Sequence, residues 1–229
     1  MAFNEGDFVE IEYSAWNASD STLIATTDEA VAKKAEIYEK QGKYGPALVI
    51  LGSPGVIKGL DRAIRTMSLN ETKKFTFKPE EAFGDRNQEL VRVIPMSDFK
   101  ARDISPYPGM KLNLDDFTAT VTSVSAGRVV VDANHPYAGR EIIYEVKVVK
   151  ELKNPEERVK ALGSTYNAEP SKISLANGSV TLSYDSKVNK NADYFVGRAS
   201  LIAAVFTYIK GVEKVDVNEE YSKPSDKHG

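Results

Sequence analysis

Residues 52–67, with the sequence GSPGVIKGLDRAIRTM, decide the fold class of this chain. Ser53 followed by Pro54 is typical of a helix N-cap and first turn. Apolar residues then recur at spacings of three, four and three, at Ile57, Leu60, Ile64 and Met67. This spacing predicts a short amphipathic helix that buries one face.

Segments on both sides of this helix alternate apolar and polar residues, which predicts β-strands with one buried face. These segments are residues 9–13, 74–78 and 142–148. Residues 47–51 are apolar throughout, which favours a central strand. Thr26, with Glu29 three residues later, has the spacing of a capping box and predicts a helix that reaches about Lys40. Strands wrapped on one short helix indicate an α+β domain with an antiparallel sheet.

In the middle of the chain the pattern changes to a short apolar stretch and three β-rich pieces. They span residues 90–94, 110–114, 117–124 and 128–132. Turns are expected at Asp115-Asp116 and Ala126-Gly127, between the β-rich pieces. We therefore expect a small all-β insert at residues 87–136, which enters and leaves a parent domain made of residues 1–86 and 137–153.

A second helix start is found at Asn154-Pro155-Glu156-Glu157, with Asn as the cap and Pro in the first turn. We place a domain boundary there and expect a C-terminal α+β domain at residues 154–229. Asn177-Gly178, between two strand-like segments, predicts a β-hairpin with a tight turn. A long helix is expected at residues 192–210, followed by a last strand.

The predicted helix at residues 192–210 carries apolar residues on almost every side. One stripe consists of Phe195, Ala199, Ile202, Phe206 and Ile209. The opposite side carries Leu201, Val205 and Tyr208. Packing of the first stripe on the neighbouring hairpin accounts for one partner, but a helix that is apolar nearly all round needs two. We therefore expect a homodimer contact through the C-terminal domain.

The composition excludes several classes of site. The chain has 30 basic and 33 acidic side chains and a net charge of -3, which argues against nucleic acid as a partner. It has no Cys and only two His, far apart, so we expect no disulfide, no thiolate nucleophile and no metal site. The longest apolar run, residues 199–209, is about half a membrane span. With no signal-peptide pattern at residues 1–8, we expect a cytoplasmic protein without a membrane partner.

Ordered motifs add a family resemblance. The motifs are VEIEY at 9–13, GSPGVIKGLD at 52–61, PEEAFG at 79–84 and IIYEV at 142–146. Together they resemble the FKBP-type peptidyl-prolyl isomerases. Further segments resemble the chaperone domain that archaeal and SlyD-type members carry in the flap. They are QELVRVIP at 88–95, PGM at 108–110 and VVVDANHPYAG at 129–139. Residues 154–229 resemble, more loosely, the extra C-terminal domain of the longer archaeal members.

The resemblance implies an FKBP-like antiparallel sheet wrapped on a short helix, and an isomerase that also acts as a folding chaperone without a cofactor. The implied partners are unfolded or proline-containing polypeptides. Rotating a peptide bond costs about 18–20 kcal/mol. No bond is broken, so no nucleophile or metal is needed. An apolar pocket favours the twisted, less polar amide of the transition state.

The resemblance also assigns site residues. The expected catalytic residues are Tyr13, Ile57, Phe83 and Tyr144. The expected substrate-binding residues of the pocket are Ile24, Ala25, Ala47, Val49, Val56 and Leu60. Those of the insert are Leu90, Val91, Val93, Ile94, Met96 and Phe99. The Ile57 N–H is expected to donate to the substrate carbonyl. The insert residues are expected near a loop broken by prolines, where some face solvent as an adaptable surface.

Three positions depart from the family pattern. Ile24-Ala25 replaces the usual Phe-Asp, Phe83 replaces the usual Tyr, and Leu60 stands where an aromatic residue is common. Each change removes a polar or π contact without opening the pocket to water, so we expect catalysis that is retained but weakened. His135 is interpreted as a turn or loop residue, and the single His228 near the end gives no reason to expect nickel binding.

Two alternatives stay open. The substituted pocket favours a holdase chaperone, catalytically weak or inactive, whose insert binds unfolded polypeptides. A weaker alternative is an assembly adaptor that works through the C-terminal domain. The intact apolar shell of the pocket favours the isomerase.

Overall fold

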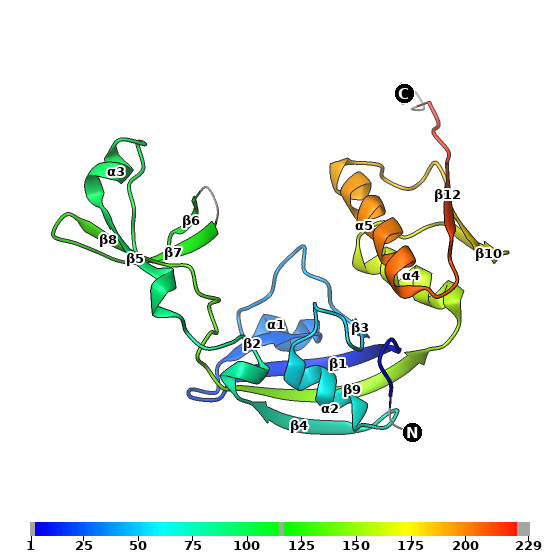
Figure 1. The fold of residues 1–229 in the computed structure, drawn as a ribbon, viewed down its shortest axis with the longest axis horizontal. Coiled ribbons are helices and arrows are strands. Elements are labelled where there is room, and N and C mark those ends of the chain that lie inside the picture. Colours follow the sequence, from blue (N-terminus) through cyan, green and yellow to red (C-terminus); the bar gives the residue numbers. More distant parts are fainter. Residues whose placement is uncertain (1–2, 115–116, 224–229) are drawn as a thin grey trace.

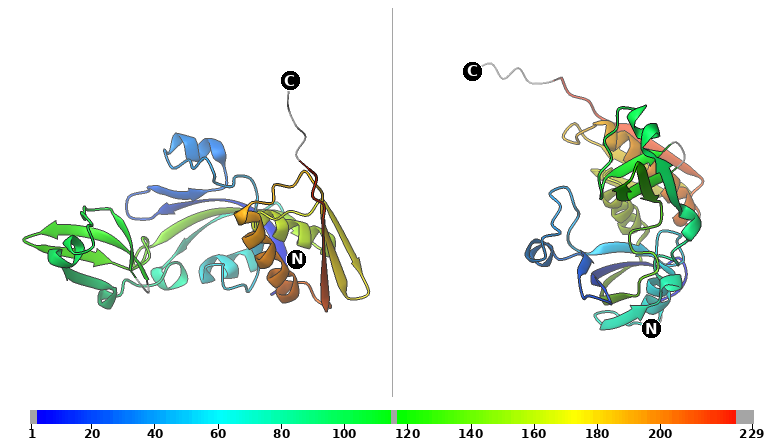
Figure 2. Two further views of the ribbon diagram at one scale, coloured as in Figure 1. Left: turned by 90° about the horizontal axis from the view of Figure 1, so that it is seen from above. Right: turned by 90° about the vertical axis from the view of Figure 1, so that its left-hand side faces the viewer.

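The computed structural model describes residues 3–114 and 117–223. Within them lie three β-sheets, arranged along the longest axis of the molecule (Figure 1). The first sheet occupies the middle, and the other two lie at its opposite ends, as the turned views also show (Figure 2). Mostly antiparallel sheets with few helices make this an α+β protein, which confirms the expected fold class.

The first sheet has the strand order β2-β1-β9-β4, with β3 also paired to β1, and all these pairings are antiparallel. The strands are β1 (Phe8–Asn17), β2 (Leu23–Thr26), β3 (Ala47–Ile50), β4 (Thr72–Phe77) and β9 (Ile142–Leu152). Helix α2 (Lys58–Arg65) packs on this sheet and buries Leu60 and Ile64 in the same core.

The prediction of a helix start at Ser53-Pro54 is wrong, because residues 53–56 form turns and α2 begins at Lys58. The Val56 N–H donates to the Ser53 carbonyl at 3.2 Å. Ile57 takes the N-cap position without a side-chain hydrogen bond. Glycine, which flanks this Ser-Pro pair on either side, has a low helix propensity and favours the turn. The predicted apolar face is buried, at Leu60, Ile64 and Met67.

Helix α1 (Glu29–Lys34) starts later and ends earlier than predicted. Its N-cap is Asp28, whose carboxylate accepts two N–H groups of the first turn at 2.8 and 3.1 Å. Thr26, the predicted start, is the last residue of β2 and pairs with β1 instead. The helix ends before Glu36, which has a positive φ of 59°. The predicted extension to Lys40 is therefore wrong.

Strand β3 is not central as predicted, because β1 is its sole partner among the described strands. Its run of apolar residues has another cause, which is that both faces of the strand are covered. Val49 packs in the core of the first sheet. Leu48 and Ile50 pack in the core of the C-terminal part of the chain.

The second sheet lies between β4 and β9 in the sequence, within the segment 87–136 that we call the insert. Its antiparallel strands are β5 (Val91–Pro95), β8 (Arg128–Asp132), β7 (Phe117–Ser125) and β6 (Lys111–Leu114), in that spatial order. The short helices η1 (Pro79–Glu81) and η2 (Gln88–Leu90) precede it. Helix α3 (Met96–Lys100) buries Phe99 in the core of the insert, so the insert is not all-β as predicted. The turn predicted at Asp115-Asp116 lies outside the described residues.

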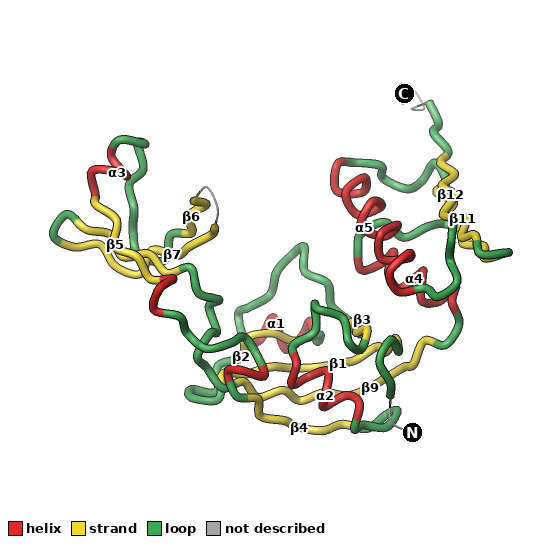
Figure 3. The backbone as a smooth tube through the Cα atoms, viewed as in Figure 1, coloured by secondary structure: helices red, strands yellow, loops and turns green. Residues whose placement is uncertain are grey.

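Loop segments connect the insert to the first sheet (Figure 3). They are tied to each other where they join the insert. The Asn134 side chain accepts the Asn87 N–H at 2.8 Å and donates to the Asn87 carbonyl at 2.9 Å. Arg86 forms an ion pair with Asp132 at 2.6 Å. These contacts close the base of the insert.

The third sheet has the order β10-β11-β12, with β11 and β12 parallel. The C-terminal elements are α4 (Pro155–Thr165), β10 (Lys172–Ala176), β11 (Ser179–Tyr184), α5 (Ala192–Tyr208) and β12 (Lys214–Glu219). Asn154 caps α4 by accepting the Glu156 N–H at 2.8 Å, which confirms the predicted helix start. Asn177 and Gly178 both have positive φ, as the tight turn between β10 and β11 requires, and this hairpin is confirmed.

The core of the third sheet extends into the first sheet. Phe8, Ile50 and Leu152, from three strands of the first sheet, pack in one cluster with residues of α4, α5 and the third sheet. The C-terminal part of the chain therefore shares a core with the part that precedes it. His228, in the tail, lies outside the described residues.

Helix α5 packs with Leu201 and Val205, which are fully buried, in the core of the C-terminal part. Phe195 and Phe206, which were expected to pack on the hairpin, are 41% and 49% exposed. The predicted first stripe is therefore split, because Phe195 and Phe206 face outward while Ile209 is buried in the C-terminal core and Ile202 packs against it. Neither α5 nor any other helix in the described part of the chain is long and apolar enough to span a membrane.

Candidate active site

An apolar cluster fills the space between the first sheet and helix α2. Tyr13 on β1 and Tyr144 on β9 lie on paired strands, and their ring centroids are 5.6 Å apart. Phe77 on β4 has its ring 5.7 Å from that of Tyr144. Three neighbouring strands thus contribute aromatic rings to one cluster.

This cluster gathers the predicted pocket residues from distant parts of the sequence. Val49, Leu60 and Tyr144 are buried in it. The partly buried residues that pack against it are Tyr13, Ile24, Ala25, Ala47, Val56, Ile57 and Phe83. The structure therefore brings together the residues that were assigned to the pocket of the parent domain.

Ile57 adds a backbone donor to the cluster. It is the N-cap of α2, with an extended backbone, and its carbonyl accepts the Asp61 N–H at 3.0 Å. Its own N–H has no hydrogen-bond partner within residues 3–114 and 117–223. This donor is available to a bound carbonyl group.

Burial keeps the two tyrosines of the cluster neutral. Tyr144 is 7% exposed. Burial raises the pKa of Tyr144, and the neighbouring Tyr13 raises this pKa further. Burial also raises the pKa of Tyr13. Both phenols stay protonated at physiological pH, so the cluster presents apolar rings and neutral hydroxyl groups.

An aromatic wall beside the cluster was not predicted from the sequence. The Phe83 ring stacks on His135, with centroids 4.3 Å apart and planes 7° from parallel. The Tyr137 ring lies 5.7 Å from Phe83 and 5.8 Å from His135. His135 does lie in a loop, as interpreted. The sequence HPY at 135–137 could have indicated this wall, because it places the rings of His135 and Tyr137 shortly before β9.

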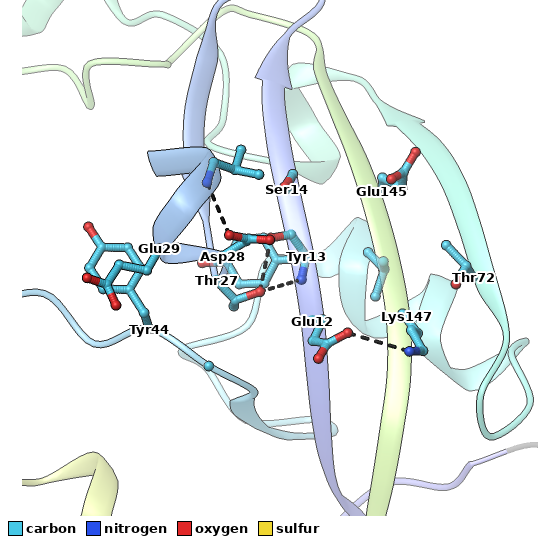
Figure 4. Close-up of a pocket in the computed structure, with 13 residues that line it drawn as sticks. Glu12, Tyr13, Ser14, Thr27, Asp28, Glu29, Tyr44, Thr72, Glu145 and Lys147 are labelled. Atoms are coloured by element: carbon cyan, nitrogen blue, oxygen red, sulfur yellow. Dashed lines mark hydrogen bonds and ion pairs between the residues drawn. The ribbon is translucent and has the colours of Figure 1, made fainter. Parts of the chain in front are cut away.

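A cavity of about 710 Å³ beside β1 has a charged lining (Figure 4). Glu12 and Lys147, on the neighbouring strands β1 and β9, form an ion pair at 3.6 Å. The Tyr13 N–H donates to the Thr27 hydroxyl at 2.9 Å. This charged lining does not match the apolar pocket that the resemblance implies, so we do not place the site there.

A second cavity, of about 590 Å³, adjoins the apolar cluster. Ile24 and Ala25 pack against the cluster and also line this cavity. Tyr137 lines it too, together with Tyr38 and Tyr44 from the loop after α1 and the charged Glu36, Glu39 and Lys43 of the same loop. The cavity therefore joins the cluster to that loop.

This arrangement can hold an apolar ring and donate hydrogen bonds, but it offers no nucleophile. A peptide group enclosed there loses the water that supports its charge-separated resonance form. Within the described residues, no group of three or more His, Cys, Asp or Glu could hold a metal ion. The chemistry that fits the cluster is a change of conformation.

Comparisons with known proteins decide the family. A family model described as FKBP-type peptidyl-prolyl cis-trans isomerase matches residues 1–100, and one described as FKBP26, IF domain, matches residues 92–137. A short-type peptidyl-prolyl cis-trans isomerase of Methanocaldococcus jannaschii is 33% identical over 144 residues, which are 63% of this chain and 90% of the relative. This chain belongs to the FKBP-type peptidyl-prolyl cis-trans isomerases.

Two proteins named SlyD are also similar to this FKBP-type isomerase. The one from Pasteurella multocida is 31% identical, over 55% of this chain and 62% of the relative. The one from Vibrio cholerae is 30% identical, over 56% of this chain and 66% of the relative. Neither family model reaches residues 154–229. The family assignment therefore rests on the first sheet and the insert.

The six insert residues predicted to bind substrate do not join the apolar cluster of this isomerase. They lie on the short elements η2, β5 and α3, next to the loop that contains Pro106 and Pro108. Leu90 and Val93 are 39% and 59% exposed. Phe99 is buried in the core of the insert. The partly buried ones are Val91, Ile94 and Met96.

Proposed function

We propose that this FKBP-type isomerase catalyses cis/trans isomerisation of X-Pro bonds in the apolar cluster around Ile57, Leu60 and Tyr144. The observation that carries this proposal is the convergence of predicted pocket residues on the unpaired Ile57 N–H. The prolyl ring would lie against Leu60 and the aromatic rings, and the Ile57 N–H would donate to a substrate carbonyl.

The proposed mechanism needs only a dry, neutral pocket. A planar amide is stabilised by charge separation, which water supports and apolar side chains do not. A twisted amide has less charge separation, so its transfer from water into the apolar pocket costs less free energy. The Tyr13 and Tyr144 hydroxyls stay neutral and add no charge that would hold water in the pocket. No bond breaks, and no cofactor takes part.

The insert is proposed to bind unfolded polypeptide. Leu90 and Val93 present apolar surface to solvent. Strand β5 lies at the edge of its sheet, and an extended chain can add to such an edge as a further strand. Binding there would raise the local concentration of a client near the pocket. The match to the IF domain and the similarity to SlyD proteins support this proposal.

The chain is proposed to contain three functional units. Residues 1–86 and 137–153 would form the isomerase unit, the insert would form the chaperone unit, and residues 154–229 would form a homodimer contact. The apolar residues on the outer side of α5 support the dimer, because Phe195, Val196 and Phe206 are exposed there. A cytoplasmic location is also proposed, in keeping with a chain that has no Cys to form disulfides.

A holdase without catalysis is the second candidate. Ala25 and Phe83 favour it, because neither side chain carries a polar group where the family pattern has Asp and Tyr. The holdase and the isomerase differ in one measurable property, the rate of X-Pro isomerisation in a short peptide.

A protease-free assay with a prolyl tetrapeptide tests the proposed site. Ile57→Pro removes the unpaired N–H and keeps a compatible φ, since Ile57 has a φ of -62°. Ile57→Ala is the matched control, because it shortens the side chain but keeps the N–H. We expect the wild type to exceed the uncatalysed rate and Ile57→Pro to be slower than Ile57→Ala. A wild-type rate equal to the uncatalysed rate would leave the holdase as the function.

A further inference from the structure

Tyr137, which carries a polar hydroxyl group, lines the 590 Å³ cavity. The Tyr137 ring is partly buried and packs against the apolar cluster. Its hydroxyl has no hydrogen-bond partner in the described part of the chain. It is also not sealed from solvent, because no buried side-chain N or O atom lacks a partner there. The cavity is where this hydroxyl can find a partner.

The position of the Tyr137 ring is fixed by its neighbours. Phe83 and His135 contact it with ring planes tilted by 46° and 53°. The Tyr137 N–H donates to His135 Nδ1 at 3.2 Å. The turn that carries the ring is tied back by the Gly139 N–H, which donates to the Gly84 carbonyl at 2.8 Å. A donor held in this way loses little conformational freedom when it binds a partner.

The cavity suits a polypeptide backbone next to the bound proline. Ile24 and Ala25 line the cavity and also pack against the cluster, so the cavity and the cluster adjoin at these two residues. Tyr38 and Tyr44 also line it, with their rings stacked at 5.5 Å. The Tyr44 hydroxyl accepts the Glu39 N–H at 3.0 Å, which holds it in the loop after α1, away from the turn that carries Tyr137 in the sequence.

We propose that the substrate backbone on the N-terminal side of proline lies in this cavity, and that the Tyr137 hydroxyl donates a hydrogen bond to a carbonyl group of that segment. This inference rests on the proposed placement of the prolyl ring in the cluster. Tyr137 would then restore a polar contact at a site where Ala25 and Phe83 supply none. It would act as a specificity-determining residue, because it would raise kcat/KM for substrates with at least one residue before the X-Pro pair.

A comparison of two peptide substrates distinguishes a role of Tyr137 in substrate binding from a purely structural role. The first is a prolyl tetrapeptide with one residue before the X-Pro pair, and the second is the same peptide without that residue. Tyr137→Phe in the full chain should lower kcat/KM about 3- to 10-fold for the longer peptide, as expected for one neutral hydrogen bond. It should change kcat/KM for the shorter peptide by less than about twofold. Tyr107→Phe, on the exposed surface of the insert, is the matched control and should change neither value.

The result that overturns the inference is an equal effect of Tyr137→Phe on both peptides, or no effect on the longer one. Failure of the underlying site gives a different pattern, because Ile57→Pro and Ile57→Ala would then have equal activity with both peptides. Circular dichroism of each variant confirms that the fold is retained before the rates are compared.

Discussion

The rings of Phe83 and His135 are nearly parallel and 4.3 Å apart, although 51 residues of chain separate the two positions in the sequence. Phe83 precedes the insert, and His135 lies at its end, after its last strand β8. The stack therefore joins the two connections of the insert directly beside the apolar cluster. One wall of the proposed pocket exists because the chain returns from the insert to the place where it left.

Removal of the imidazole should loosen this wall. His135→Ala is expected to lower kcat/KM for a tetrapeptide about 2- to 10-fold, because an aromatic pair contributes about 0.5–1.5 kcal/mol. His135→Phe keeps a ring on Phe83 and should retain most of the activity. His135 is exposed, so neither variant should shift the melting temperature by more than a few degrees. Equal losses in the two variants would show that the stack does not support the wall.

Restored polar groups should raise the activity. The double variant Ala25→Asp with Phe83→Tyr is expected to isomerise tetrapeptides faster than the wild type, because each recovered neutral hydrogen bond contributes about 0.5–1.5 kcal/mol. The two single variants measure the separate contributions. A double variant no faster than the wild type would contradict the view that these two substitutions weaken the pocket.

Loss of the insert should separate two activities. Replacement of residues 88–133 by a short turn keeps Asn87, Asn134 and His135, and it should leave tetrapeptide turnover within about a few-fold, because short peptides cannot reach the replaced residues. It should strongly slow the proline-limited refolding of a whole protein. The double variant Leu90→Ser with Val93→Ser, which changes only exposed side chains, should also slow this refolding. If turnover and refolding fall together after the replacement, the insert merely supports the isomerase.

Charges on the outer face of α5 should prevent self-association. We expect light scattering to detect a dimer of the full chain at tens of micromolar, a rough range for weak dimers. Phe195→Glu and Phe206→Glu place charge on exposed apolar positions and should give a monomer. Lys210→Glu, beyond the end of the helix, is the control and should remain dimeric. A monomeric wild type at this concentration would disprove the dimer.

The carboxylate of Glu219 should stabilise the C-terminal part of the chain except in acid. It accepts hydrogen bonds from the Tyr194 and Tyr221 hydroxyls at 2.5 and 2.6 Å and pairs with Arg198. Burial alone would raise its pKa, but these hydrogen bonds and the Arg198 charge lower the pKa to about 2. Because the pKa is lower in the folded state, the stabilisation is present above about pH 4.5 and is lost as the pH falls toward 2.

Glu219→Gln should therefore lower the free energy of unfolding by about 2 kcal/mol at pH 7, the scale of a hydrogen bond to a charged group. The difference between variant and wild type should shrink as the pH falls from 4 to 2. Urea unfolding at several pH values measures both quantities. A difference that does not depend on pH would mean that the shape of the side chain, and not its charge, supports α5 and β12.

Local patterns were sufficient for much of the fold. Alternation along β1, β4 and β9 predicted strands because the period of two is a property of each strand by itself. The Asn-Gly hairpin and the Asn154 cap depend on a few adjacent residues and were also predicted. The pocket residues came from ordered motifs and not from periodicity, because apolar residues of a pocket and of a core look alike in a sequence.

Features that depend on distant contacts were not predictable. The apolar run of β3 reads as a central strand, but the C-terminal core covers one face of it. Helix α5 has two apolar sides, and the neighbouring elements decide which side is buried. Thr26 and Asp28 both offer a cap for α1, and pairing of β2 with β1 leaves only Asp28 free to act. Tyr137 lines the cavity only because the chain returns from the insert to the first sheet at that point.

The packing of Phe8, Ile50 and Leu152 in the C-terminal core determines which parts of the chain unfold together. Removal of residues 154–229 would expose these three side chains on the isomerase sheet, so that sheet and the C-terminal part should unfold together. The core of the insert consists of its own residues. The core of the insert should therefore unfold separately from the core that the other two sheets share. Three sheets thus form two cooperative folding units.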